Sequence, residues 1–124
     1  MDVQLYNGLS LAYIGDAVYE LFIREYFLKQ GLTKVNRLHQ QVTAYTSGSS
    51  QAEAIHFLLE KNLLTEEEIM YFKRGRNAHV HTTRKNIDLQ TYLDATGFEA
   101  LIGFLYLSGN QTRIKELLTI LLEV

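Results

Sequence analysis

Apolar residues recur along most of the chain at the spacing of helices. From Leu9 to Leu28 nearly every position is apolar, and charged side chains such as Asp16, Glu20 and Arg24 drift slowly around one side of a helix that turns about 100° per residue. This segment predicts a long helix in the middle of a bundle. No segment alternates between apolar and polar residues with period two, so the pattern predicts an all-α fold.

Capping residues divide the rest of the chain into further helices. Gly31 is expected to follow the end of the first helix, where a left-handed residue is favoured. Each later helix is expected to begin at a residue whose side chain accepts a hydrogen bond from the first turn. The predicted helices and caps are 33–45 from Thr33, 50–62 from the capping box Ser50-x-x-Glu53, 65–74 from Thr65-x-x-Glu68, 88–108 from Asp88, and a last helix from Asn110 or Thr112.

The segment 75–87, GRNAHVHTTRKNI, shows no helical face and no strand pattern. Loops of this length inside a small domain tend to carry function. The loop overlaps the stretch 73–85, which holds five Lys or Arg residues and no acid. The whole chain has a net charge of −2 and this stretch contributes +5, so the remainder carries −7. A basic segment on an acidic body predicts an element that binds a polyanion.

Length and composition narrow the classes of protein. The chain has 124 residues, which fits a single domain over residues 1–124. Cysteine is absent, which excludes disulfides, thiolate metal sites and cysteine nucleophiles. Charged residues interrupt every apolar run before it reaches bilayer-spanning length, and the N-terminus does not resemble a signal peptide. We therefore expect a soluble, cytoplasmic protein without membrane contact.

Two carboxylates stand out because their sequence neighbours are apolar. Asp16 lies in LSLAYIGDAVYELF and Glu99 in TGFEALIGFLYL, and an ionised carboxylate in such surroundings needs a cation or hydrogen-bond donors. Small residues on the same helix faces are expected to let the two helices approach closely; they are Ala12, Gly15, Ala95 and Gly103. Two convergent carboxylates would form an oxygen site for Mg²⁺ or Mn²⁺. The alternative for either acid alone is a solvated residue on a helix face or an N-cap.

Two motifs resemble the ribonuclease III family. Tyr13-Ile14-Gly15-Asp16-Ala17-Val18 is similar to the family signature, in which an apolar helix carries Gly-Asp-(Ala/Ser)-Val, and Phe98-Glu99-Ala100-Leu101-Ile102-Gly103 is similar to its second acidic motif. The resemblance covers nearly the whole chain. The chain looks most like the Mini-ribonuclease III branch, which consists of the catalytic domain alone. Two observations favour this branch: the basic stretches 73–78 and 82–86, and an end where longer members are expected to begin their double-stranded RNA-binding domain.

The resemblance implies a helical endoribonuclease that forms a homodimer and cuts double-stranded RNA with Mg²⁺, or Mn²⁺ as a substitute. Asp16 and Glu99 match the two acids that the family uses as metal ligands and catalytic groups. Two further acids of ribonuclease III proper are replaced here by Ala12 and Thr96, so water and RNA phosphate are expected to complete the metal site. The resemblance also implies a precursor of ribosomal RNA as substrate, cut near the mature ends of the large-subunit RNA, with a ribosomal protein as a partner.

The basic segment is the predicted RNA-binding element, because a duplex is recognised mainly through phosphates and 2′-hydroxyls. The candidate contacts are Lys73, Arg74, Arg76, Asn77, Thr82, Thr83, Arg84 and Lys85, with Ser47, Ser49, Ser50 and Gln51 as weaker candidates. The alternative is a solvated charged loop. His79 and His81 are expected to contact phosphate or nothing, and His39 and His56 to be ordinary helix residues. Glu20 is either an outer metal ligand or the partner of Arg24 one turn later.

Two other function classes stay open at this point. One is a catalytically inactive double-stranded RNA-binding module of the same fold, which the replaced acids at Ala12 and Thr96 would suit. The other is a helical protein-interaction domain, which leaves the basic segment unexplained. Asp16 and Glu99 favour the enzyme, because a protein that only binds a polyphosphate has no reason to hold two acids beside it.

Overall fold

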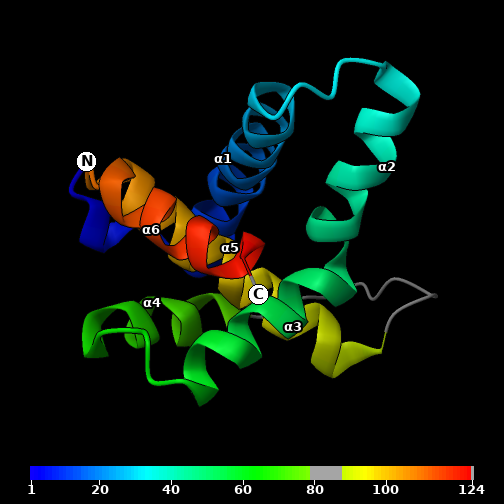
Figure 1. Ribbon diagram of the computed structural model, residues 1–124. Coiled ribbons are helices and arrows are strands. Elements are labelled where there is room, and N and C mark those ends of the chain that lie inside the picture. Colours follow the sequence, from blue (N-terminus) through cyan, green and yellow to red (C-terminus); the bar gives the residue numbers. More distant parts are fainter. Residues whose placement is uncertain (79–87, 124) are drawn as a thin grey trace.

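Six α-helices make up most of the described chain (Figure 1). The structure is a computed structural model that describes residues 1–78 and 88–123. Within these ranges there is no β-strand, which confirms the predicted all-α fold, and no helix combines the length and apolarity needed to cross a membrane. The elements are the 3-10 helix η1 (Val3–Leu5) and the α-helices α1 (Gly8–Lys29), α2 (Val35–Thr46), α3 (Gly48–Glu60), α4 (Glu66–Arg76), α5 (Leu89–Leu107) and α6 (Gln111–Leu122).

Helix α5 forms the centre of the molecule. Nearly every residue over 94–105 is buried, and α1, α3 and α4 pack against this helix (Figure 1). Aromatic rings fill two of these contacts: Tyr19 of α1 meets Phe98 edge to face with centroids 5.0 Å apart, and Tyr71 of α4 stacks on Phe104 at 3.7 Å. A helix covered on several sides is stable only if it is apolar nearly all round, as α5 is.

Helix α1 is not the central helix, so that prediction is wrong. It buries Leu11, Val18 and Ile23 in the core, yet Tyr13 and Leu21 are 84% and 61% exposed. Both α1 and α5 are apolar around most of their circumference, but only α5 has neighbours on enough sides to cover that surface. Helix α1 therefore presents an apolar stripe outward.

Three predicted caps occur at the expected residues. The capping box is present in α4, where Thr65 and Glu68 exchange hydrogen bonds of 2.8 and 3.1 Å. Asp88 caps α5, and bonds from Thr91 lower the pKa of this carboxyl below its usual range. Asn110 rather than Thr112 caps α6, and Gly31 follows α1 with a φ of 93°, as expected.

The predicted starts of α2 and α3 are wrong. Lys34 precedes α2 and supplies no side-chain cap, so Thr33 does not have the role assigned to it. Helix α3 begins before Ser50, because the Ser47 hydroxyl accepts the Ser50 amide at 3.2 Å. The Ser50 hydroxyl and the Gln51 amide donate to carbonyls at the end of α2. These polar side chains, which were weaker candidates for RNA contacts, hold the junction between α2 and α3.

Helix α4 extends further than predicted. It runs to Arg76, so the expected irregular segment does not begin at residue 75. Gly75 allows this continuation to lie directly on α5, since a Cβ added there would stand 3.0 Å from the Cα of Gly97 and closer still to the side chain of Ala100. Residues 79–87, the larger part of the predicted loop, lie outside the described residues.

A buried ion pair ties α4 to α6. The Arg113 guanidinium donates to Glu68 at 2.7 and 2.8 Å and to the carbonyl of Leu63 at 2.7 Å. Burial alone would raise the pKa of Glu68, but the hydrogen bonds and charge of Arg113, with those of Thr65, outweigh burial and lower the pKa. Glu68 is therefore a structural carboxylate whose charge is neutralised within the fold.

Candidate active site

Helices α1 and α5 cross at two glycines. A Cβ added to Gly15 would overlap the carbonyl oxygen of Glu99 and stand 2.8 Å from the amide nitrogen of Gly103. A Cβ added to Gly103 would overlap the carbonyl oxygen of Leu11. Backbone meets backbone at both positions, so neither has room for a side chain. The predicted close approach of these two helices is confirmed.

This crossing brings the two predicted catalytic acids to one place in the fold. Asp16 directly follows Gly15 on α1, and Glu99 is the α5 residue whose carbonyl group Gly15 contacts. The Asp16 side chain is exposed and Glu99 is half-buried, so the site opens to solvent. Ala12 and Ala95 are buried in the same part of the molecule. Two motifs far apart in sequence thus meet at one helix contact, while the chemical roles of the acids stay a prediction.

The donors at this crossing suit a hard divalent cation. Two carboxylates offer only oxygen ligands, and Mg²⁺ is commonly held by one or two carboxylates together with water and phosphate oxygens. Among residues 1–78 and 88–123, no group of three or more Asp, Glu, His or Cys side chains is placed to share a metal ion. At the positions of the replaced family acids, Ala12 carries no donor and the Thr96 hydroxyl donates to the carbonyl of Tyr92 at 2.9 Å.

Glu20 pairs with Arg24 rather than extending the acid pair. Its Oε2 lies 3.1 Å from Nη2 of Arg24, one turn further along α1. This geometry favours the i,i+4 ion pair over an outer metal ligand.

The described part of the basic segment lies at the end of α4, where it begins to leave the core. Lys73 is exposed and Asn77 is the C-cap of the helix. Arg76 forms an ion pair with a carboxylate of α5. The other candidate RNA contacts and two histidines lie outside the described residues: Thr82, Thr83, Arg84, Lys85, His79 and His81. No contact with RNA is tested by this geometry, and the RNA-binding roles stay a prediction.

Arg74 has a structural role in addition to the one predicted for it. Its Nη1 donates to the carbonyls of Gln4 and Tyr6 at 2.8 and 3.0 Å, and its guanidinium lies 4.6 Å above the ring of Tyr71. Arg74 therefore fastens the N-terminal segment to α4. Replacing it would disturb the fold as well as any RNA contact.

The sequence interpretation missed a third carboxylate, Asp94, which is 3% exposed. Its Oδ2 lies 2.7 Å from Nε2 of His56, and its Oδ1 lies 3.0 Å from Nε of Arg76. The Gln90 amide donates to both oxygens at 3.2 and 3.3 Å. The sequence carried a signal, because Asp94, like Asp16, is an isolated acid in a mostly apolar helix. His56 is correspondingly more than an ordinary helix residue.

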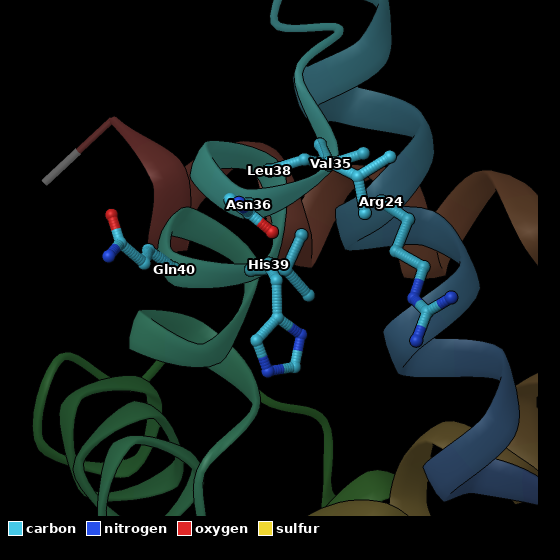
Figure 2. A pocket seen from close by; sticks show the side chains of 7 residues that line it. Arg24, Val35, Asn36, Leu38, His39 and Gln40 are labelled. Carbon is cyan, nitrogen blue, oxygen red and sulfur yellow. The ribbon is translucent and has the colours of Figure 1, made fainter.

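A separate groove of about 590 Å³ lies between α1 and α2 (Figure 2). Arg24 of α1 and His39 of α2 stand on opposite sides of it, and its other lining residues are Val35, Asn36, Leu38, Gln40 and Val42. Neither Asp16 nor Glu99 lines this groove. The candidate active site at the helix crossing is therefore separate from this groove.

The chain resembles a protein family model and several known proteins. The ribonuclease III domain family matches residues 9–110 of the chain. Similar proteins include the Mini-ribonuclease 3 of Streptococcus pneumoniae, 46% identical over 96% of this chain and 93% of that protein, and the Mini-ribonuclease 3 of Enterococcus faecalis, 49% identical over 94% and 89%. The Mini-ribonuclease 3 of Staphylococcus aureus is 43% identical over 98% and 91%.

A solved structure also shares the fold. The crystal structure of a protein from Fusobacterium nucleatum superposes with a TM-score of 0.89 and 32% sequence identity, over 100% of this chain and 99% of that chain. The likeness extends over the whole arrangement of helices that forms the crossing of α1 and α5.

Proposed function

The chain belongs to the ribonuclease III family and is an endoribonuclease of that family, and we propose that it hydrolyses phosphodiester bonds of double-stranded RNA with Mg²⁺ held between Asp16 and Glu99. The observation that carries this proposal is the crossing of α1 and α5, where Gly15 and Gly103 bring the two acids together. An oxygen-only donor pair open to solvent leaves room for water and for an RNA phosphate.

The chain's own contribution is placement and charge. Asp16 and Glu99 are fixed by two rigid helices, so their carboxylates need little reorganisation when a cation and a phosphate arrive. Mg²⁺, when bound there, would neutralise the phosphate and supply an activated water. The exposed Lys73, at the end of α4, is positioned to attract the RNA backbone toward the helix bundle.

We also propose that the protein acts as a homodimer that pairs through α1. The stripe of α1 that faces outward includes Leu9, Tyr13 and Leu21, all exposed. A hollow of about 500 Å³ beside it is lined by Tyr6, Asn7, Leu9, Ser10, Tyr13, Ile14 and Leu107. In a two-fold interface the exposed Tyr13 of one copy would enter the hollow of the other, and each Asp16, one turn from Tyr13, would lie at the rim of the interface.

The dimer is tested by Tyr13→Lys, which places a charge on the stripe. We expect this variant to sediment as a monomer at concentrations where the parent protein is a dimer. Met70→Lys, at an exposed apolar residue of α4, is the matched control and should leave the dimer intact. A Tyr13→Lys protein that stays dimeric would assign the interface to another surface.

The family resemblance supports a more specific substrate. We propose a cytoplasmic role on a precursor of ribosomal RNA, with cleavage near the mature ends of the large-subunit RNA and assistance from a ribosomal protein. Mapping the ends of this RNA in cells that lack the protein tests the proposal. Extended ends are expected, and mature ends in the deletion strain would rule this substrate out.

The central experiment compares three nucleic acids under three metal conditions. A long RNA duplex, one of its single strands and a DNA duplex of the same sequence are incubated with Mg²⁺, with Mn²⁺ and with EDTA. Cleavage is expected only for the RNA duplex and only with a metal ion. Asp16→Asn should stop cleavage while binding persists, whereas Glu20→Gln, one turn away, is the control and should cleave normally. Binding without cleavage by the parent protein would instead favour the inactive RNA-binding module.

A further inference from the structure

The side chains around Asp94, five residues before Glu99 on α5, form a second cluster that reaches the surface. Asp94 itself is buried, but His56 is 58% exposed and Arg76 is 39% exposed. The three residues come from three helices, Asp94 from α5, His56 from α3 and Arg76 from α4. One buried carboxylate thus holds an imidazole and a guanidinium that both reach solvent. Gln90 completes the bonds to Asp94.

The geometry leaves nitrogen atoms of both His56 and Arg76 that Asp94 does not contact. Asp94 engages Nε2 of the imidazole, so the proton in this bond lies on Nε2 and Nδ1 is the nitrogen left for a ligand. The same carboxylate engages Nε of Arg76, the nitrogen nearest the chain, which leaves the two amino groups at the end of the guanidinium. Two donors held side by side in this way match two oxygens of one phosphate.

We propose that His56 and Arg76 form a seat for a phosphate of the RNA backbone, and that Asp94 is a positioning residue that holds both in place. This inference rests on the proposed function, because it takes double-stranded RNA as the ligand. It adds a contact on α3 that the basic segment alone does not include. Arg76 and Gln90 stand close to the two ends of the segment 79–87, so the seat lies at the base of the predicted RNA-binding element.

The seat makes RNA binding dependent on pH. A phosphate oxygen that accepts a hydrogen bond from Nδ1 requires the protonated imidazole, so duplex binding is coupled to the uptake of a proton and strengthens as the solution becomes more acidic. Within residues 1–78 and 88–123, the charged groups around this imidazole are Asp94 from α5, Arg76 from α4 behind the same carboxylate, and Glu53 and Glu60 one turn away on α3. Asp94 and Arg76 largely offset each other, so protonation of His56 adds a net positive charge to the seat.

The test measures the affinity for an RNA duplex in EDTA, where cleavage is absent, for His56→Gln and Arg76→Gln. Each substitution is expected to weaken binding about tenfold, since each removes a hydrogen bond to a charged group. Arg76→Gln should also reduce the slope of log affinity against log salt by about one unit at most. His39→Gln and Arg24→Gln are matched controls on α2 and α1 and should bind as the parent does.

The pH profile separates contact from structural support. Between pH 6 and 8 the parent and His39→Gln should lose affinity as the pH rises, while His56→Gln should show a flatter profile than either. Asp94→Asn should weaken binding in the folded protein, and because His56 is mostly exposed, His56→Gln provides the test even where Asp94→Asn fails to fold. His56→Gln and Arg76→Gln proteins that bind like their controls would overturn the seat while leaving the nuclease intact.

The experiments distinguish a site for a small anion from a site for RNA, and a failure of this inference from a failure of the proposed function. If inorganic phosphate shifts the imidazole NMR signals of His56 but the duplex does not, the seat serves a small anion and the RNA assignment is overturned. If the parent protein neither binds nor cleaves the duplex, the proposed function fails and this inference fails with it. If the parent protein cleaves the duplex normally and the His56→Gln and Arg76→Gln variants bind it as tightly as the parent does, only the phosphate seat is ruled out.

Discussion

Two carboxylate sites share helix α5, and they differ in what surrounds the acid. Asp94 is buried, and its two oxygens meet an imidazole, a guanidinium and an amide. Asp16, opposite Glu99 at the crossing of α1, is exposed, and no ion pair or hydrogen bond joins its carboxylate to the residues of 1–78 and 88–123. The first site is complete without a ligand, whereas the second offers oxygens to solvent.

This difference is the reason for proposing a positioning role for Asp94 and a metal-binding role for Asp16. A carboxylate that already contacts Arg and His gains little from Mg²⁺, because the cation would have to displace them. Asp16, in contrast, has no cationic side chain paired with it among residues 1–78 and 88–123. Asp94 on α5 is thereby suited to the proposed organising of RNA contacts, and Asp16 on α1 to the proposed holding of a metal ion.

The largest effect is expected from changing charge without changing size at the two sites. Asp16→Asn and Glu99→Gln should each lower the turnover of an RNA duplex about 100-fold or more, because each removes a carboxylate that is proposed to hold the cation that stabilises developing charge. Asp94→Asn should instead leave turnover at saturating duplex within about threefold and raise KM, since it acts on binding. Steady-state cleavage with Mg²⁺ gives both constants. An Asp94→Asn protein with normal KM and lost turnover would reverse the assignment of the two sites.

The crossing of α1 and α5 was predictable from the sequence, and the Asp94 cluster was not. Gly15 and Gly103 sit beside isolated acids in helices with strong periodicity, so their close contact follows from local pattern. The partners of Asp94 come from three helices, and no local spacing indicates that His56 and Arg76 point at one carboxylate. Long-range pairing of this kind depends on how helices are packed, which periodicity does not specify.

The same reason explains the other errors of prediction. Thr33 and Ser50 have the side chains of caps, but α2 and α3 begin after Lys34 and Ser47, and the Ser47 hydroxyl has the capping role that was expected of Ser50. Helix α1 has the composition of a central helix, yet whether its apolar surplus meets another helix or faces outward depends on the tertiary arrangement. Composition indicates how much surface a helix has to bury, and packing decides where.

The backbone contact itself can be broken at Gly15. Gly15→Ala places a Cβ on the carbonyl of Glu99, so α1 and α5 must separate; we expect the free energy of unfolding to fall by about 3 kcal/mol and cleavage to be lost. Urea denaturation and duplex cleavage measure the two effects. Gln41→Ala, at an exposed position of α2, is the control. A stable, active Gly15→Ala protein would mean that the crossing does not set the position of the acids.

A third carboxylate, Glu68, serves as a comparison for Asp94. Like Asp94 it is buried and paired with an arginine, but its partner is Arg113 of α6. Glu68→Gln should destabilise the protein by about 2 kcal/mol at neutral pH, since Arg113 is only 21% exposed and loses its partner. It should not change RNA affinity. Glu67→Gln, exposed next to it, is the control. Loss of RNA binding in folded Glu68→Gln would show that any neutralised acid affects binding, and would weaken the special role of Asp94.

The pH dependence of this effect has a defined sign. The pKa of Glu68 is lowered in the folded protein, so its contribution to stability is present above the ordinary glutamate pKa of about 4.3 and is lost as the pH falls through the folded value. The unfolding free energies of the parent and Glu68→Gln, measured in urea from pH 7 to pH 3, should therefore converge at the acid end. A gap that widened with acid would contradict the lowered pKa.

The smallest expected effect is on protein stability when Asp94 or Asp16 is replaced by asparagine. Asp94→Asn should cost only about 1 kcal/mol, because the new amide oxygen keeps one hydrogen bond and the partner that loses its acceptor, His56 or Arg76, reaches solvent and can bond to water instead. Asp16→Asn should change stability by less than about 0.5 kcal/mol, as expected for an exposed side chain without a partner in the described chain. Thermal unfolding of both variants beside the parent measures this. A marked loss at Asp16 would show that its carboxylate supports the fold, and a metal-binding role would then no longer explain why an acid stands at that position.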